Sequence, residues 1–500
     1  VGSEMCIRDR IINDRMTPVS ILITIVAYFI ILFTVSYIAG RKADNEGFFV
    51  GNRKSAWYVV AFAMIGSSIS GVTFVSVPGM VAASGFSYLQ MVLGFVAGQI
   101  IIAFVLIPLF YRMNLVSIYE YLENRFGLSS YKTGAWFFFI SKMLGAAVRL
   151  FLVCLTLQLL VFEPFHLPFI LNVIITVALV WLYTFRGGVK SLIWTDSLKT
   201  FCLVVSVVLC IYYIASDLKL GFGSMIATIS ENDFSRMFFF DDVNDKRYFF
   251  KQFLAGVFTM IAMTGLDQDM MQKNLTCRNL REAQKDMCVY GLAFLPVNAL
   301  FLGLGILLST LCANEQLAMP SGDGLLPAMV SSGVLGAWVV VPFTIGIVAA
   351  AFSSADSALT ALTTTACIDL LRIEERNLTA EQARRIRRRV HAVMVMLFLL
   401  CMILFRLANN NNVLNAIYVM ASYTYGPLLG LYAFGLYTRH GVTDRWVPLV
   451  CLAAPLVCAW LDYFAPRLWN YTFGYELLLL NGVLTFGGLW LLRSRKGGLG

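Results

Sequence analysis

Long apolar runs recur along the whole of this chain, and each is long enough to cross a lipid bilayer as a helix. The first, TPVSILITIVAYFIILFTVSYIAG, covers residues 17–40, and about twelve more follow it. A helix of about 20 residues spans a hydrocarbon core roughly 30 Å thick and satisfies its own backbone hydrogen bonds there. Charged residues make up only 13% of the chain, against about 25% in soluble domains. We therefore predict an all-α polytopic membrane protein with about 13 transmembrane helices.

The first run is too long for the apolar part of a signal peptide, and it ends in GRK rather than in a small-residue cleavage site. We expect the native start at Met16, with residues 1–15 a non-native N-terminal scar and residues 16–500 a single transmembrane domain. The later spans are expected near residues 55–83, 85–111, 133–162, 168–184, 188–215, 248–266, 285–312, 332–371, 389–406, 411–438, 445–463 and 474–492.

Basic residues gather in alternate loops, which predicts the orientation. The loops on one side include GRK (40–42), NRK (52–54), KNLTCRNLR (273–281), RIRRR (385–389) and RSRK (493–496), whereas FEPFHLP (162–168) and ANEQLAMPSGDG (313–324) contain no Lys or Arg. Cytoplasmic loops carry the excess of positive charge. We therefore expect a protein of the cell inner (plasma) membrane with its N-terminus outside and its C-terminus in the cytoplasm. The net charge of +9 then reflects topology rather than nucleic-acid binding.

Several other classes of protein are disfavoured by what the sequence lacks. It has no CxxC pair and only three histidines, so a disulfide framework, a zinc site or a histidine relay is not expected. It has no Gly-rich phosphate loop or nucleophile elbow, so we expect neither an enzyme nor an organic cofactor. The longest hydrophilic interruptions, 216–247 and 372–388, are too short for the output domain of a membrane receptor.

One apolar segment carries an unusual polar stripe. In AAAFSSADSALTALTTTACIDL (349–370), a helical period of about 100° per residue gathers small and hydroxyl side chains on one face, with Asp356 at its border. Such hydroxyls often serve only to pack helices closely. Two adjacent serines beside an aspartate are better explained by hard oxygen ligands for a monovalent cation, and sodium is the natural candidate. The residues of this face are Ala350, Ser353, Ser354, Ser357, Thr360, Ala361 and Thr364.

The second apolar run is interrupted in its middle. It reads AFAMIGSSISGVTFVSVPGMVAASG (61–85), with Gly66, Gly71, Pro78 and Gly79 inside it. An unwound segment in a transmembrane helix exposes backbone carbonyls that can bind an ion. The alternative is that these glycines only permit close helix packing.

Five segments together resemble the sodium:solute symporter family, whose members carry proline, sugars, sialic acid, vitamins and monocarboxylates. They are GSSISGVTFVSVPG (66–79), YTFRGGVKSLIWTD (183–196), TGLDQDMMQKNLTCRNLREAQ (264–284), the serine segment above and YTYGPLLGL (423–431). The resemblance implies a transporter of the leucine-transporter fold, with five-helix inverted repeats at about 55–215 and 248–438. Broken helices near 55–83 and 248–266 would begin the two repeats, with the substrate between them.

The resemblance also implies sodium ligands. The common sodium site of the family corresponds here to the carbonyls of Gly66, Ile69 and Ala350 and the hydroxyls of Ser353 and Ser354. A second sodium site, found in some sialic acid carriers of the family, corresponds to Asp196, Ser353, Asp356 and Ser357. The sequence departs from the pattern there, because Asp356 stands where a serine is expected. Two acids could hold sodium more tightly or share a proton, or Asp356 could pair with Arg149 or Lys142.

Substrate contacts are suggested by a cation in the middle of a span. Arg149 lies within FFFISKMLGAAVRLFLVC (137–154), where a guanidinium is costly unless it meets an anion, and its planar fork suits a carboxylate. Its position resembles that of the arginine that binds the acid group in sialic acid carriers, and Ser70 and Thr73 match polar pocket positions. Gln90 is a further candidate from the next helix. The alternative role of Arg149 is a structural ion pair with Asp356 or Asp196.

The sequence therefore predicts a sodium-coupled symporter that imports a small organic solute, best represented by a carboxylate-bearing one such as sialic acid. Proline, a monocarboxylate or a neutral sugar remain alternatives, and a proton acting through Asp196 and Asp356 could replace sodium. A channel would need a continuous polar pore, whereas the polar residues here concentrate in one cluster. Sodium is the only cofactor expected, and the lipid bilayer and the solute are the expected partners.

Overall fold

The protein is described here by a computed structural model covering residues 18–40, 45–243, 245–315, 322–326, 329, 335, 337–407, 413–468, 471, 473–474 and 476–494. Helices account for most of these residues, which confirms the predicted all-α fold class. The only strands within them are β1 (Gly441–Val442) and β2 (Arg493–Ser494), which pair antiparallel.

The helices follow one another with short connections. They are α2 (Pro18–Gly40), α3 (Asn45–Val50), α4 (Trp57–Ser68), α5 (Gly71–Ser84), α6 (Tyr88–Ile101), α7 (Ile107–Arg112), α8 (Glu120–Arg125), α9 (Leu128–Leu157), α10 (Phe169–Asp217), α11 (Phe222–Ser230), α12 (Phe249–Met260), α13 (Gln268–Asn274), α14 (Leu280–Asn314), α16 (Ala337–Thr365), α17 (Ala380–Leu407), α18 (Val413–Tyr437), α19 (Val447–Leu468) and α20 (Leu477–Leu491). Single π-helical turns continue α6, α9, α12 and α16 at Ile102–Leu106, Gln158–Phe162, Ile261–Gly265 and Ala366–Leu370.

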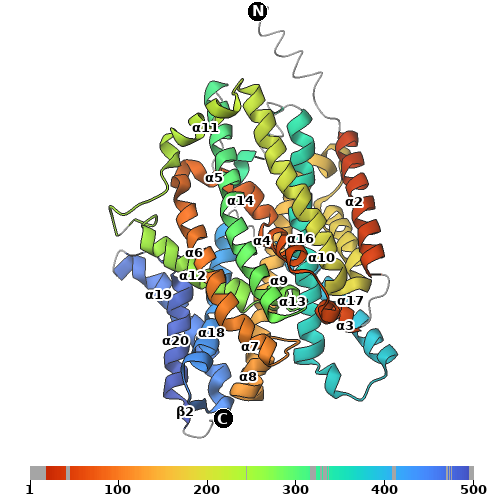
Figure 1. Ribbon diagram of the computed structural model, residues 1–500, viewed down its shortest axis with the longest axis vertical. Coiled ribbons are helices and arrows are strands. Elements are labelled where there is room, and N and C mark those ends of the chain that lie inside the picture. Colours follow the sequence, from red (N-terminus) through yellow and green to blue (C-terminus); the bar gives the residue numbers. More distant parts are fainter. Residues whose placement is uncertain are drawn as a thin grey trace, which may run out of the picture.

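The helices form one bundle around α16 (Figure 1). In the most apolar window of the span that contains α16, 89% of the residues are buried, against 22% for α17. Helices α2 and α19–α20 lie at opposite edges of the bundle in Figure 1, while α4, α10 and α16 lie near its centre. The serine-bearing segment is therefore enclosed by protein on all sides, as a polar stripe in a membrane requires.

Eight helices among the described residues are long and apolar enough to cross a membrane, and α12 with α13 makes a ninth if the bent pair is one span. Three shorter apolar helices, Trp57–Ser68, Phe169–Thr184 and Leu477–Leu491, lie where further spans are expected. The total of about thirteen stays a prediction. The two expected spans 168–184 and 188–215 are joined in α10, which is kinked at Gly188, where φ is +51°. A side chain there would strike the ring of Phe48, so only glycine fits this turn.

The predicted break in the second apolar run is confirmed. Helix α4 ends at Ser68, α5 begins at Gly71, and Ile69 and Ser70 between them are extended, with ψ values of 95° and 170°. A Cβ on Gly71 would lie 2.5 Å from a methyl of Val153 on α9. The glycine therefore lets the chain turn back into a helix close against α9.

The second broken helix is the pair α12 and α13, which meet at an angle of 71°. Leu266 and Asp267 form the break, and the Asp267 carboxylate caps α13 by accepting a hydrogen bond from the Asp269 backbone N–H at 2.9 Å. Each of the two predicted broken helices is thus interrupted in the structure. The repeat boundaries at about 55–215 and 248–438 stay predictions.

Candidate ion and substrate site

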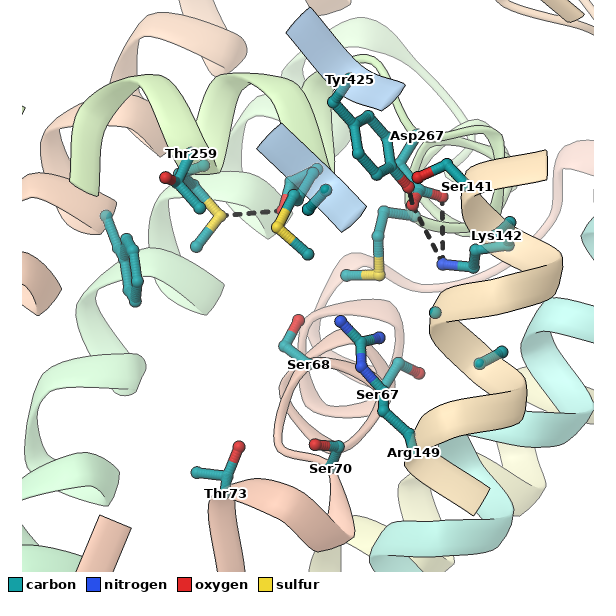
Figure 2. A pocket seen from close by; sticks show the side chains of 18 of the residues that line it. Ser67, Ser68, Ser70, Thr73, Ser141, Lys142, Arg149, Thr259, Asp267 and Tyr425 are labelled. Atoms are coloured by element: carbon teal, nitrogen blue, oxygen red, sulfur yellow. Dashed lines mark hydrogen bonds and ion pairs between the residues drawn. The ribbon is translucent and has the colours of Figure 1, made fainter. Parts of the chain in front are cut away.

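A pocket opens between the two broken helices (Figure 2). Its space between atoms, including the open part, is about 1050 Å³, which accommodates a small organic solute. Its polar wall combines hydroxyls of the first broken helix with charged groups of α9 and of the second break. The polar lining residues are Ser67, Ser68, Ser70, Thr73, Ser141, Lys142, Arg149, Thr259, Thr264, Asp267, Tyr290 and Tyr425.

Arg149 points from α9 into this pocket, beside the serines of the first break (Figure 2). Its guanidinium makes no ion pair with any residue that the structure describes. The alternative role as a partner of Asp356 or Asp196 is therefore wrong, because other cations already occupy both acids. A half-buried guanidinium with unused donors can receive a carboxylate in two-point fashion.

Lys142 lies two turns away on α9 and is paired. Its ammonium is 3.0 Å from Asp267 and 2.7 Å from Asp269, and the Tyr425 hydroxyl donates to Asp267 at 2.6 Å. This cluster joins α9, α13 and α18 at one wall of the pocket (Figure 2). It also rules out Lys142 as the partner of Asp356.

Ser70 and Thr73 line the pocket as predicted, but Gln90 does not. The Gln90 amide is buried and donates to the backbone oxygens of Arg247 at 2.8 Å and Ser87 at 3.3 Å, and its oxygen accepts from the Phe239 N–H at 3.1 Å. Both ends of the amide therefore hold the segment before α12. The expectation that Gln90 contacts substrate is corrected, because its polar groups are used in fixing this segment.

Three of the five predicted sodium ligands, Ala350, Ser353 and Ser354, lie along one short stretch of α16, while Gly66 and Ile69 lie at the first break. A Cβ on Gly71, at the end of the break, would lie 3.8 Å from the backbone oxygen of Ile347 on α16. Ten residues further along α16, Ser357 accepts a hydrogen bond from Lys273, and Ser67 on α4 accepts from the same ammonium group. Ala350, Ser353 and Ser354 lie between these two points, opposite the break. Ser67, beside the break, and Ser353, on α16, both donate to Asp196, so the two elements adjoin there, and the sodium site itself stays a prediction.

The break itself supplies free acceptors. No hydrogen bond from any described residue reaches the carbonyl oxygens of Gly66 and Ile69. Buried backbone carbonyls are nearly always paired, so two unpaired ones at a break are available to a weakly charged cation. The Ser354 hydroxyl donates to the Ala350 carbonyl at 3.4 Å and keeps its lone pairs available.

The four residues of the predicted second sodium site also meet, but around two lysines. Asp196 on α10 accepts hydrogen bonds from Ser353 at 3.3 Å and from Ser357 at 3.2 Å. It also accepts from the ammonium groups of Lys273 at 2.7 Å and Lys199 at 3.1 Å. Lys199 bonds Asp356 as well, and the Tyr183 hydroxyl donates to Asp356 at 2.9 Å.

Sequence reasoning missed both lysines. Lys273 was expected in a basic loop, whereas it is fully buried near the end of α13, because the chain continues as a helix beyond the second break. Lys199 follows Asp196 by three residues within an apolar run, and an ionisable residue inside a span is itself a functional signal. The position of Lys273 could not be read from the sequence, since only the bend between α12 and α13 carries it inward.

Comparisons with known proteins agree with this geometry. The Sodium:solute symporter family model matches residues 48–443. The sodium/sialic acid symporter NanT of Aliivibrio fischeri is 24% identical over 425 residues, covering 81% of this chain and 80% of that protein. SiaT of Proteus mirabilis, another sodium/sialic acid symporter, is 22% identical over 420 residues, covering 81% and 82%. The human sodium-coupled monocarboxylate transporter 2 is 25% identical over 268 residues, covering 53% and 42%.

Solved structures show the same fold. A Na⁺-coupled sialic acid symporter in a substrate-bound, outward-open state superposes with a TM-score of 0.80 at 18% identity, covering 94% of this chain and 97% of that one. The nucleobase-cation-symport-1 family transporter Mhp1 gives a TM-score of 0.52 at 13% identity, covering 88% and 92%. Both have the leucine-transporter fold. With the family model matching most of its length, this chain belongs to the sodium:solute symporter family and is a sodium-coupled transporter rather than an enzyme.

Proposed function

We propose that this protein imports a carboxylate-bearing organic solute together with sodium, and that the solute is best represented by sialic acid. One observation carries the proposal: the Arg149 guanidinium projects into the pocket without an acidic partner among the described residues. A charge left unpaired in such a place is costly unless a ligand neutralises it. A carboxylate matches its fork in geometry and in charge.

The names of the relatives support the same chemistry. NanT and SiaT are named for sialic acid, and the human relative for monocarboxylates; each of these solutes carries a carboxylate. Ser70 and Thr73 would then contact the hydroxyl-bearing part of the solute across the pocket from Arg149. Proline also bears a carboxylate and remains a candidate, whereas a neutral sugar would leave Arg149 without a counter-charge.

Sodium would bind between the carbonyls of Gly66, Ile69 and Ala350 and the hydroxyls of Ser353 and Ser354. Bound there, it ties the first break to α16 and favours the substrate-competent state by its higher affinity for that state. The solute then binds and the bundle turns to release both inside. An inside-negative potential contributes about 2.3 kcal/mol per charge moved across 100 mV.

The orientation that fits this role places the N-terminus outside and the C-terminus in the cytoplasm of the plasma membrane, as the basic loops predict. Cysteine-specific labelling of intact cells tests it. Cysteines introduced at Phe165, in the loop before α10, and at Arg385, in α17, lie on opposite sides in this scheme. An impermeant reagent should label the first in intact cells and the second only after lysis.

Uptake of labelled sialic acid into proteoliposomes under an inward sodium gradient tests the proposed solute, with pyruvate, proline and glucose as competitors. We expect uptake that requires sodium and is lost in Arg149→Ala. Arg281→Ala removes an exposed guanidinium outside the pocket and should transport normally. Sodium-driven uptake of glucose in place of sialic acid, or normal uptake of sialic acid by Arg149→Ala, would overturn the proposal.

A further inference from the structure

We propose that the ammonium group of Lys273 takes the place of a second sodium ion, so that this transporter binds one sodium per cycle and carries its other cation in its own chain. The inference rests on the sodium coupling proposed above and concerns the number of ions. It departs from the expectation that Asp196, Ser353, Asp356 and Ser357 form a second sodium site.

The surroundings of Lys273 are those of a coordinated cation. Its ammonium donates to Asp196 Oδ2 at 2.7 Å, to Ser357 Oγ at 2.5 Å and to Ser67 Oγ. A lysine has three donors, and each meets an acceptor. The three acceptors belong to α10, α16 and α4, while Lys273 itself belongs to α13. One ammonium thus links both broken helices to the serine-bearing helix, which is the bridging role expected of a bound ion.

Asp196 has no acceptor left for an added ion. Its Oδ1 accepts from Lys199 at 3.1 Å and from Ser353 at 3.3 Å. Its Oδ2 accepts from Lys273, from Ser67 at 3.1 Å and from Ser357 at 3.2 Å. An ionised carboxylate offers about four lone-pair positions. The two ammonium groups and the hydroxyls of Ser353 and Ser357 already fill them, even when the single Ser67 proton goes to the Ala63 carbonyl instead. Sodium could reach Asp196 only by displacing one of them.

The charges of the cluster are already balanced. Lys199 and Lys273 carry two positive charges, Asp196 and Asp356 carry two negative ones, and each of the four side chains is at most 1% exposed. Asp269, whose carboxylate lies 3.9 Å from the Lys273 ammonium, is paired more closely with Lys142, at 2.7 Å. Sodium at the predicted second site would be a third cation against Asp196 and Asp356, two carboxylates that are already paired, and such crowding is unfavourable in a buried site. The aspartate at position 356 is explained in the same way, because it provides the charge that Lys199 requires.

The first sodium site is of the opposite kind. No ammonium group of the described residues donates to Ser354 or to the carbonyls of Gly66 and Ile69. Its oxygens are neutral and partly unpaired, and a single monovalent cation fits them without displacing a group of the protein. The first site would therefore hold an exchangeable sodium ion, and the neighbouring site holds the ammonium group of Lys273, which is covalently part of the chain.

Counting bound sodium tests the proposal directly. Binding of radioactive ²²Na⁺ to the purified full-length protein should saturate at about one ion per chain, with a Hill coefficient near one. Saturation at two ions in protein that takes up sialic acid with sodium would overturn this inference alone. Absence of sodium binding would overturn both this inference and the proposed sodium coupling.

A variant tests which group holds the second position. Lys273→Met leaves the cluster with a net negative charge and an empty position, so the number of bound sodium ions should rise from one to two. Lys273→Arg keeps the charge and should bind one. Lys285→Met removes an exposed lysine on α14 and should also bind one. A folded Lys273→Met protein that still binds one ion would overturn the assignment.

Transport by the wild-type protein provides a further test, which requires no variant. With one sodium per monoanionic solute, no net charge crosses the membrane, so an imposed potassium diffusion potential should leave the steady-state accumulation of sialic acid unchanged. A tenfold sodium gradient should then support at most tenfold accumulation. Accumulation that rises with an inside-negative potential would indicate a second sodium and overturn the inference.

Discussion

Lys273 and Arg149 are both cations beside the breaks, but Lys273 is buried, Arg149 is half-buried, and the groups around them differ. Each of the three N–H donors of the Lys273 ammonium meets an acceptor atom of the protein. Arg149 lines the pocket and makes no ion pair with any residue that the structure describes. A cation whose charge is neutralised by its own chain stabilises the bundle, whereas one left unpaired is available to a ligand.

The difference follows from where each residue lies. Lys273 is on a short helix turned by 71° into the centre of the bundle, where two acids and two hydroxyls surround it. Arg149 is on α9, forms no ion pair with any described acid, and faces the open space between the breaks (Figure 2). Five substitutions would break or sharpen this contrast.

The largest effect is expected from Asp196→Ala. This substitution leaves Lys199 with Asp356, and Lys273 with Asp269 at 3.9 Å, as their remaining acidic partners, and breaking a buried ion pair costs about 3–5 kcal/mol. We expect a severe loss of folded protein, measured as yield of monodisperse protein and as thermal unfolding in detergent. Asp233→Ala removes an exposed carboxylate and is the control. An Asp196→Ala protein as stable as wild type would show that the lysine cluster is not structural.

Arg149→Lys should separate charge from geometry in the pocket. Lysine keeps the positive charge but loses the two-point fork, and one charge-assisted hydrogen bond contributes about 1.5–3 kcal/mol. The KM for sialic acid should therefore rise by about tenfold to a hundredfold, while the thermal stability without substrate stays close to that of wild type. A large loss of stability instead would mean that Arg149 is a structural cation like Lys273.

Ser354→Ala and Ser357→Ala should differ although the two serines are only three positions apart in the sequence. Ser354 is a proposed sodium ligand, so its loss should raise the half-saturating sodium concentration about tenfold, which corresponds to about 1.4 kcal/mol of binding free energy. Ser357 accepts from Lys273, so its loss should lower stability by about 1–3 kcal/mol with little change in sodium affinity. Sodium titration of uptake, with unfolding measured in sodium-free buffer, checks both. Equal shifts in sodium affinity would remove the distinction between the two sites.

Gln90→Ala should have the smallest effect on transport. Its amide holds the backbone at Phe239 and Arg247, so the expected loss is about 1 kcal/mol of stability for each unpaired group. The KM values for sodium and for sialic acid should stay unchanged. A raised KM for sialic acid with unchanged stability would return Gln90 to the substrate pocket.

Much of the fold was predictable because the membrane restricts the choices. Apolar runs of sufficient length must be helices there, and the glycines around Ile69 and Ser70 indicated a break that the structure confirms. Ser70, Thr73 and Arg149 were placed correctly in one pocket. Gln90 was misplaced because the sequence does not show that its amide is already used by the segment before α12.

The sequence by itself determined that this protein is a helical transporter with a broken helix, a serine-bearing helix and a cation in mid-span, because hydrophobic length and local composition govern these features. The tertiary structure alone decided which charges are paired. Asp196, Lys199, Lys273 and Asp356 come from three helices, and their pairing depends on the bend between α12 and α13. The strength of a buried charge interaction depends on distances of a few ångströms, and those distances are set by packing between helices rather than by the order of residues.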